Sequence, residues 1–209
     1  MHRSIRGSVV LVGACMLAVT CAWAQQQPSA QKQSAASADF ALTYTTERGQ
    51  LTSPNGGSFW IQGGGADAAV TLWKGLGIAG SVVGGHASNI APGVDLNKIE
   101  FTAGPRYTYT LRTGHPGAAD QRRLQLFGQG LIGGVRAFDG VFPAGSAAST
   151  SAASYAVDAG GGLNLFFSNR LGVRLVEADY VRTALPNNGS NVQNDLRLSA
   201  GIVYHFGKR

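Results

Sequence analysis

The chain has 209 residues, of which 30 are glycine and only 13% are charged, and its formal net charge is +6. No run of about 18 apolar residues occurs beyond the N-terminal region, which excludes a membrane protein built from helices. The basic residues are scattered along the chain, which argues against a nucleic-acid-binding surface. A membrane barrel made of strands is compatible with these values, because its inward-facing residues lower the mean hydropathy.

Residues 1–24 have the three parts of a secretory signal peptide: two arginines, an apolar segment at Val9–Ala22, and an A-x-A cleavage site that ends at Ala24. The alternative is a lipoprotein with a lipidated Cys15, but the apolar segment before Cys15 is very short. Because Cys15 and Cys21 both lie in the segment to be removed, we expect no thiol or disulfide in the mature protein.

Residues 25–38 are rich in glutamine, serine and alanine and show no apolar period. We expect them to form a disordered periplasmic lead-in. The domain that folds is then 39–209, which is long enough for one domain.

Apolar and polar residues alternate in eight segments of this domain, which is typical of strands with two different faces. In the last segment, every second residue from Leu196 to Phe206 is apolar, whereas Asp195 and Arg197 belong to the alternate set. The predicted strands are 39–48, 58–73, 76–86, 99–111, 123–138, 154–167, 171–183 and 195–206.

The predicted connections alternate between long and short. The long ones are 49–57, 87–97, 139–153 and 184–194, and the short ones are 74–75, 113–122 and 168–170. This alternation predicts an all-β fold, an eight-stranded antiparallel up-and-down transmembrane β-barrel with four long extracellular loops and three short periplasmic turns. The strand lengths also meet the requirement of about 9–11 residues for a tilted membrane-spanning strand.

Three positions interrupt the alternation. The run Gly63–Gly65 predicts a bulge or a change of phase in its strand. Pro105 lacks an amide proton, so it requires a bulge or an unpaired ladder position. The glycine-rich segment 123–138 leaves the choice of its inner face open.

The seventh strand contains a conflict of phase, because Arg174 alternates oppositely to Glu177 and Asp179. A one-residue bulge near Leu175–Val176 would place all three charges on the same side of the sheet. We therefore predict a bulge there.

The two faces of the strands differ in bulk, which decides which one is inside. Eight strands enclose a space only just wide enough for side chains, so large aromatics are expected outside, facing lipid, and small or paired charged residues inside. A soluble β-sandwich is the alternative. The aromatics expected to face the membrane are Phe40, Tyr44, Phe101, Tyr107, Tyr109, Tyr155, Phe167, Tyr204 and Phe206. The expected lumen charges are Glu100, Arg106, Asp158, Arg174, Glu177, Asp179 and Arg197.

This pattern resembles the small eight-stranded outer-membrane barrels, the OmpA-like and opacity-protein-like group. The resemblance rests on G-I-V-Y-H-F near the C-terminus, on L-G-V-R-L-V-E-A-D-Y-V-R-T in the seventh strand, and on the alternating connections. It implies a bacterial outer-membrane location, with lipids and lipopolysaccharide as surroundings. The sequence itself leaves the oligomeric state open, and we expect a monomer. The resemblance also implies that the aromatic-x-Phe pattern at Tyr204–Phe206 is read by the barrel-assembly machinery, although three residues follow it here.

Two glycine runs, at Gly75–Gly80 and Gly128–Gly133, match the dinucleotide fingerprint, but neither opens a helix and composition explains them. The four histidines show no metal-ligand spacing. We therefore expect no cofactor, no metal and no nucleic-acid partner.

These features favour a structural, envelope-stabilising or surface-interaction role without enzymatic activity. The alternative is a narrow pore for ions or small solutes. A minor alternative is a lipid A-modifying hydrolase, because His86 and Ser88 resemble the H-x-S pair of certain eight-stranded outer-membrane deacylases. Two residues that are two apart on a strand share a face, so His86 is placed to activate Ser88.

Overall fold

The computed structural model describes residues 36–50, 57–113, 122–144, 147–187 and 191–207. The predicted signal peptide and almost all of the predicted lead-in lie outside these residues. The described strands are β1 (Ser37–Gln50), β2 (Ser58–Trp73), β3 (Leu76–Ala91), β4 (Val94–Thr113), β5 (Arg122–Ala144), β6 (Ala147–Phe166), β7 (Leu171–Thr183) and β8 (Gln193–Phe206). No helix with the length and hydropathy needed to cross a membrane is found in this described part of the chain.

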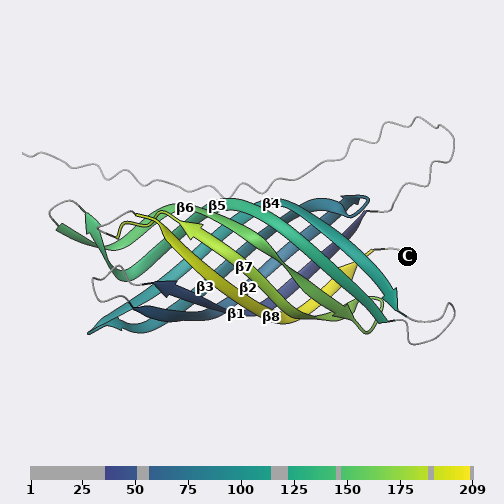
Figure 1. Cartoon of the computed structure of the whole chain (residues 1–209), viewed down its shortest axis with the longest axis horizontal. Coiled ribbons are helices and arrows are strands. Elements are labelled where there is room, and N and C mark those ends of the chain that lie inside the picture. Colours follow the sequence, from purple (N-terminus) through teal and green to yellow (C-terminus); the bar gives the residue numbers. More distant parts are fainter. Residues whose placement is uncertain (1–35, 51–56, 114–121, 145–146, 188–190, 208–209) are drawn as a thin grey trace, which may run out of the picture. The chain divides into compact units, whose positions relative to one another are not determined.

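The eight strands form one closed antiparallel barrel. Each strand pairs with its neighbours in sequence, and β8 returns to pair with β1, from Ala38 opposite Phe206 to Arg48 opposite Leu196. Figure 1 shows the strands crossing the barrel obliquely, with β3 to β6 reaching furthest at the left. The predicted eight-stranded antiparallel barrel is confirmed.

We call the end where β1 passes to β2 the loop mouth, and the end where β2 turns into β3 the turn mouth. Lys74 and Gly75 form the two-residue turn at the second end, as predicted, and both have positive φ angles. The last residues of β8 reach the turn mouth (Figure 1).

The barrel is apolar outside and polar inside. In β8, Leu196 and Ile202 are 51% and 56% exposed on the outer face, whereas the inward Arg197 and Ser199 are 2% and 6% exposed. This is the reverse of a soluble barrel, in which the apolar set of an alternating strand covers the core.

The predicted bulge in β7 is confirmed. The pairing of β7 with β8 shifts register between Arg174 and Glu177, and its pairing with β6 shifts at the same place. One extra residue there brings Arg174, Glu177 and Asp179 to the inner face, where all three are buried.

Pro105 occupies an unpaired ladder position, the second of its two predicted solutions. It stays in register with Ile78 of β3, but the ladder between β4 and β5 is interrupted between Ala103 and Arg106. The amide proton that Pro105 lacks therefore removes no hydrogen bond from the ladder between β3 and β4.

The phase of β5 is settled by its large side chains. Phe127, Leu131 and Val135 are buried inside the barrel, and Leu126 and Ile132 are exposed outside. The inner face of β5 thus carries Phe127 and Leu131, which are larger than the inward Val181 of β7 and Val203 of β8.

The predicted bulge at Gly63–Gly65 is wrong. β2 keeps a continuous register with both β1 and β3 through these residues. The glycines instead permit a close approach between strands, because a Cβ atom on Gly63 would overlap the carbonyl oxygen of Gly84.

Two of the predicted long loops are also wrong. β3 and β4 continue through 87–97 and leave only Pro92 and Gly93 between them, and β5 and β6 continue through most of 139–153. The second segment is rich in alanine and serine, a composition typical of loops, but it continues the antiparallel pairing of β5 with β6. The two hairpins therefore extend as ribbons at the loop mouth.

Close strand approach gives a test of the barrel geometry. A Cβ atom on the inward Gly133 would overlap the carbonyl oxygen of Phe101, whereas one on the outward Gly134 would lie 3.6 Å from the oxygen of Ser154, an ordinary contact. We expect Gly133→Ala to destabilise the barrel by about 1–3 kcal/mol, the usual range for overpacking, and Gly134→Ala to have little effect. Urea unfolding of the two refolded variants measures the difference, and equal midpoints would contradict the close approach.

Candidate functional site

The inside of the barrel holds the densest group of functional side chains. The structure places all seven charges expected in the lumen on inner faces of β4, β6, β7 and β8, each no more than 6% exposed. Alternation along each strand, together with the β7 bulge, explains this placement. The seven are Glu100, Arg106, Asp158, Arg174, Glu177, Asp179 and Arg197.

The central part of this network is built around Asp67 of β2, which binds two arginines. Arg174 Nη1 lies 2.6 Å from Asp67 Oδ2 and 2.6 Å from Glu177 Oε2, and Arg106 Nη1 donates to Asp67 Oδ1 over 2.8 Å. Both arginines are almost fully buried. Each charge is paired, which buried ions require.

Gln129 of β5 joins the central ion pairs to each other. Its Oε1 accepts from Arg106 Nε at 2.9 Å, and its Nε2 donates to Glu177 Oε1 at 2.9 Å and Asp179 Oδ1 at 3.1 Å. An amide can do this because it carries both a donor and an acceptor. Gln129 thereby connects β4, β5 and β7 across the lumen.

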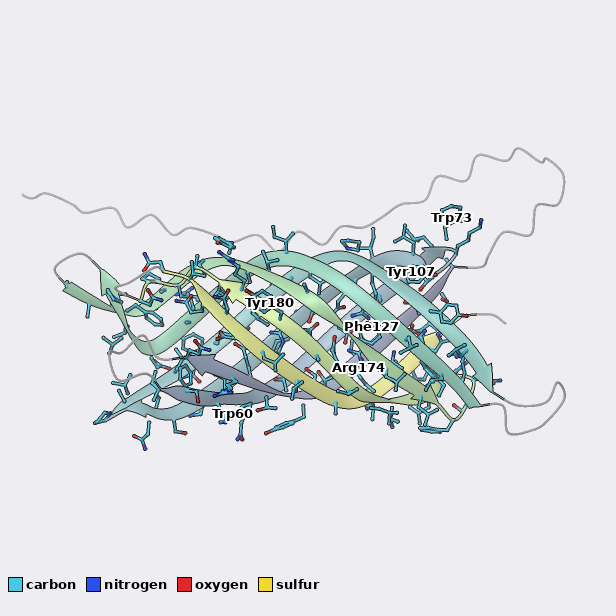
Figure 2. The ribbon with its side chains drawn as sticks, viewed as in Figure 1. Trp60, Trp73, Tyr107, Phe127, Arg174 and Tyr180 are labelled. Atoms are coloured by element: carbon cyan, nitrogen blue, oxygen red, sulfur yellow. The ribbon has the colours of Figure 1, made fainter. Side chains whose placement is uncertain are left out.

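Phe127 packs against the two arginines of the central group. The guanidinium carbons of Arg106 and Arg174 lie 4.5 Å and 4.7 Å from the centre of its ring. Figure 2 shows Phe127 and Arg174 close together in the middle of the barrel. The ring fills the lumen here and favours both cations through its π face.

A second group lies nearer the loop mouth. Arg197 Nη1 lies 2.8 Å from Glu100 Oε1, and Arg197 Nη2 lies 2.7 Å from Asp158 Oδ2. Lys98 Nζ contacts Glu47 and lies 3.7 Å from Glu100 Oε2. This group connects β1, β4, β6 and β8.

A third group extends from the centre to the turn mouth. Arg174 Nε donates to Asn164 Oδ1 at 3.1 Å, Asn164 Nδ2 donates to Gln125 at 2.8 Å, and Gln125 donates to Asp39 at 3.0 Å. Asp39 also lies 2.6 Å from His205 Nδ1. A chain of polar side chains therefore runs from the centre of the lumen to the turn mouth, where Ala41, Phe166 and Val203 form a buried apolar cluster.

Sequence analysis missed several members of this network. Asp67 and Glu47 lie in the predicted inward sets of their strands, so the alternation alone was a sufficient signal for them. Gln129 and Phe127 had no such signal, because the phase of their strand was open. Lys98 lies between the predicted loop 87–97 and the predicted strand 99–111, and in the structure it belongs to β4.

The expected membrane-facing aromatics lie mostly on the outer surface. Eight of them are 39–59% exposed: Phe40, Tyr44, Phe101, Tyr107, Tyr109, Tyr155, Phe167 and Phe206. Tyr204 is half-buried, with its ring 4.6 Å from that of Phe206 and its hydroxyl 3.4 Å from Arg170 Nη1.

Metal binding has no support in the part of the chain that the structure describes, since no group of three or more His, Cys, Asp or Glu side chains there is arranged to hold an ion. His205 contacts Asp39 of the lumen network and the edge of the Phe166 ring.

The comparisons with known proteins give a fold but no family. No family model and no curated protein matches the chain. Among solved structures, neisserial surface protein A is similar with a TM-score of 0.53 and 16% identity, over 79% of this chain and 96% of that one. Ail, the attachment invasion locus protein of Yersinia pestis, solved in complex with the heparin analogue sucrose octasulfate, is similar with a TM-score of 0.50 and 16% identity, over 82% and 99%. The chain therefore has the fold of the small eight-stranded outer-membrane barrels, as the sequence resemblance implied.

Because Asp67 and Glu177 both pair with Arg174, we expect removal of Arg174 to destabilise the barrel strongly. In Arg174→Met, Glu177 loses its ion-pair partner and Asp67 keeps only Arg106, so we expect a loss of about 3–5 kcal/mol in unfolding free energy. The outward, exposed Arg182 of the same strand is the control, and Arg182→Met should change stability by less than about 1 kcal/mol. Urea unfolding of both refolded variants measures the two changes in stability. A similar midpoint for the two would show that the central ion pairs contribute little to stability.

Proposed function

We propose that this protein spans the outer membrane of a bacterium as a closed barrel, with a structural, envelope-stabilising or surface-interaction role. Residues 1–24 would direct its export and be removed. The observation that carries the proposal is the reversed distribution of side chains, in which large apolar residues cover the outside and buried ion pairs cross the inside.

The outer surface supports a lipid environment. Exposed large apolar side chains occur on all eight strands, for example Leu42 of β1, Ile78 of β3 and Ile132 of β5, with exposures of 48%, 60% and 66%. A monomeric soluble protein rarely exposes a continuous apolar surface of this kind. The closed ladder leaves no unpaired strand edge between β8 and β1, which a lipid environment also demands.

Two pairs of aromatic residues, spaced apart along the barrel axis, support a membrane-spanning orientation. Figure 2 shows Trp60 and Tyr180 toward the loop mouth, and Trp73 and Tyr107 toward the turn mouth. All four are exposed, between 46% and 63%. Amphipathic rings favour the two interfaces of a bilayer, and an apolar band lies between these pairs.

The packed lumen favours a closed barrel over a pore. The gap lined by Asp67, Gln129, Asp158 and Arg197 has a volume of about 10 Å³, which is room for about one water molecule. On the turn-mouth side of this gap, Phe127 and the two arginines that it contacts fill the section. A continuous water path would require these side chains to move apart.

Partners follow from the outer surface. Arg48, Arg136 and Arg182 are exposed on outer faces of β1, β5 and β7, and they would favour phosphate groups of lipopolysaccharide and other anionic lipids. β8 would present Tyr204 and Phe206 to the barrel-assembly machinery. Because the barrel closes on itself, a monomer is sufficient.

Membrane insertion has a direct test. We expect the full-length protein to fractionate with the outer membrane, and the folded barrel to migrate faster on a gel before boiling than after boiling. Lipid and detergent stabilise the barrel by covering its apolar outside, so removal of detergent should precipitate it. A mature protein that stays folded and dissolved without detergent would overturn the proposal.

Closure of the lumen has a separate test. Wild-type protein in planar bilayers should give no reproducible single-channel steps, because Phe127 and its two arginines block the section. Phe127→Ala combined with Arg106→Ala should give steps, provided that heat-modifiable mobility shows a folded barrel. Steps from the wild-type protein would instead support the narrow pore.

A further inference from the structure

An apolar pocket of about 260 Å³ lies at the loop mouth, where β3 to β6 reach furthest (Figure 1). Its most buried lining residues are Leu96 of β4, Phe142 of β5 and Leu185, which follows β7, and each is only 8–9% exposed. Phe59 of β2 and Ile90 of β3 line the same pocket and are half-buried. The pocket thus brings together apolar side chains from the ends of four strands and from the segment after β7.

The side chain of Gln193, at the start of β8, holds Leu185 in place. The backbone N–H of Leu185 donates to Gln193 Oε1 over 2.9 Å, and Gln193 Nε2 donates to the carbonyl oxygen of Leu185 over 2.9 Å. Thr183 Oγ1 donates to the same Oε1 over 3.0 Å. The Gln193 amide therefore replaces the strand partner that Leu185 lacks, so this wall of the pocket exists before a ligand binds. A preformed site loses less conformational entropy on binding than one that must be assembled.

The lining of the pocket carries no charged side chain among the residues that the structure describes. Two of its amide side chains are engaged within the protein. Gln193 binds the backbone of Leu185, and Asn187 and Asn191 exchange two hydrogen bonds, of 3.0 Å and 2.9 Å, between side-chain oxygens and backbone N–H groups. Burial of a charge without a partner is costly. The pocket therefore favours an uncharged molecule.

Packed side chains close the pocket toward the centre of the barrel. Val135, Ala137 and Ala156 extend the apolar cluster on the lumen side, and none of them is more than 3% exposed. Val135 lies opposite Glu100 in the ladder between β4 and β5, so the cluster reaches the ion pairs nearer the loop mouth. The open side of the pocket is at Val141, which is 62% exposed. A molecule in the pocket therefore enters from the loop mouth and does not continue into the lumen.

The volume of the pocket indicates the size of its ligand. A cavity of about 150 Å³ lined by Leu, Ile and Phe side chains takes up one benzene molecule. In proportion, the pocket at the loop mouth has room for about ten carbon atoms. Phe59 and Phe142 in the lining favour contact with another ring.

We propose that this pocket binds a small, uncharged, mainly hydrocarbon molecule of about ten carbon atoms. The affinity comes from removing the apolar surface of this molecule from water. The site gives the proposed surface-interaction role a class of ligand, an apolar compound taken up from the medium. Uptake from outside the cell rests on the proposed orientation of the barrel in the membrane, whereas binding itself does not.

The first test compares naphthalene, an uncharged hydrocarbon of the required size, with 1-naphthoate as ligands of the full chain in lipid nanodiscs. Methyl NMR should show saturable shifts at Ile90, Leu96 and Leu185 with naphthalene. The exposed outward Ile78 and Ile202 should change only in proportion to the naphthalene dissolved in the bilayer. 1-Naphthoate should bind at least about tenfold more weakly, because its carboxylate finds no partner in the pocket. Shifts at the pocket methyls that never saturate, or equal affinity for 1-naphthoate, would overturn the proposal.

A second test locates the ligand by filling the pocket. Val141 lines the pocket from its exposed side, so Val141→Trp adds bulk there without entering the buried cluster. We expect Val141→Trp to weaken naphthalene binding by about tenfold or more. Ile132→Trp, at a 66% exposed position on the outer face of the same strand, is the matched control and should leave the affinity unchanged. Wild-type affinity in a Val141→Trp barrel that keeps its heat-modifiable mobility would show that naphthalene binds elsewhere, and the proposed site would be wrong.

These tests are independent of the proposed membrane location. A barrel that fractionates with the outer membrane but shows no saturable naphthalene binding would refute the pocket alone. A barrel that binds naphthalene with the expected difference between the two variants, but does not fractionate with the outer membrane, would confirm the pocket and refute the location.

Discussion

The narrowness of an eight-stranded ring is the constraint on which this structure depends. Eight strands enclose only enough space for side chains, and the outside is apolar all round. A charge that points inward therefore has no solvent to hydrate it and must find a partner within the lumen. Asp67, Arg106 and Arg174 satisfy this by sharing one carboxylate between two guanidinium groups.

The same constraint explains why the network joins strands that are distant in sequence. Arg174 and Asp67 are 107 residues apart, and Arg197 and Glu100 are 97 apart, yet each pair meets across the lumen. Such contacts require the opposite walls of a closed barrel, so they stabilise the closed barrel relative to a partly paired sheet. Phe127 adds bulk beside two cations, where a further polar group would need further hydrogen-bond partners.

The sequence predicts the structure best in strands where apolar and polar residues alternate and charged residues mark the inner face. The bulge in β7 was predictable because Arg174 would otherwise face lipid while Glu177 and Asp179 faced the lumen, and that arrangement is costly. It failed for β5, where glycine at alternate positions hides the phase and Phe127 is large but inward. It also failed at Gly63–Gly65, because close approach of two strands and a bulge have the same glycine signature.

The long ribbons at the loop mouth bring polar side chains from different strands together on the outer face of the barrel. Composition read these segments as loops, so the pairing of His86 with Asn97 was not visible in the sequence, although the shared face of His86 and Ser88 was. In the ribbon, His86 and Asn97 meet on the outer face, while their neighbours Ala87 and Leu96 fill the apolar cluster inside. Asp139 joins them because its backbone is left-handed, with φ of 62°, at the point where the register of β5 with β6 is interrupted. The regular parts of these strands expose mostly apolar side chains and glycine. Irregular pairing at the loop mouth thus places polar groups at the edge of this apolar surface.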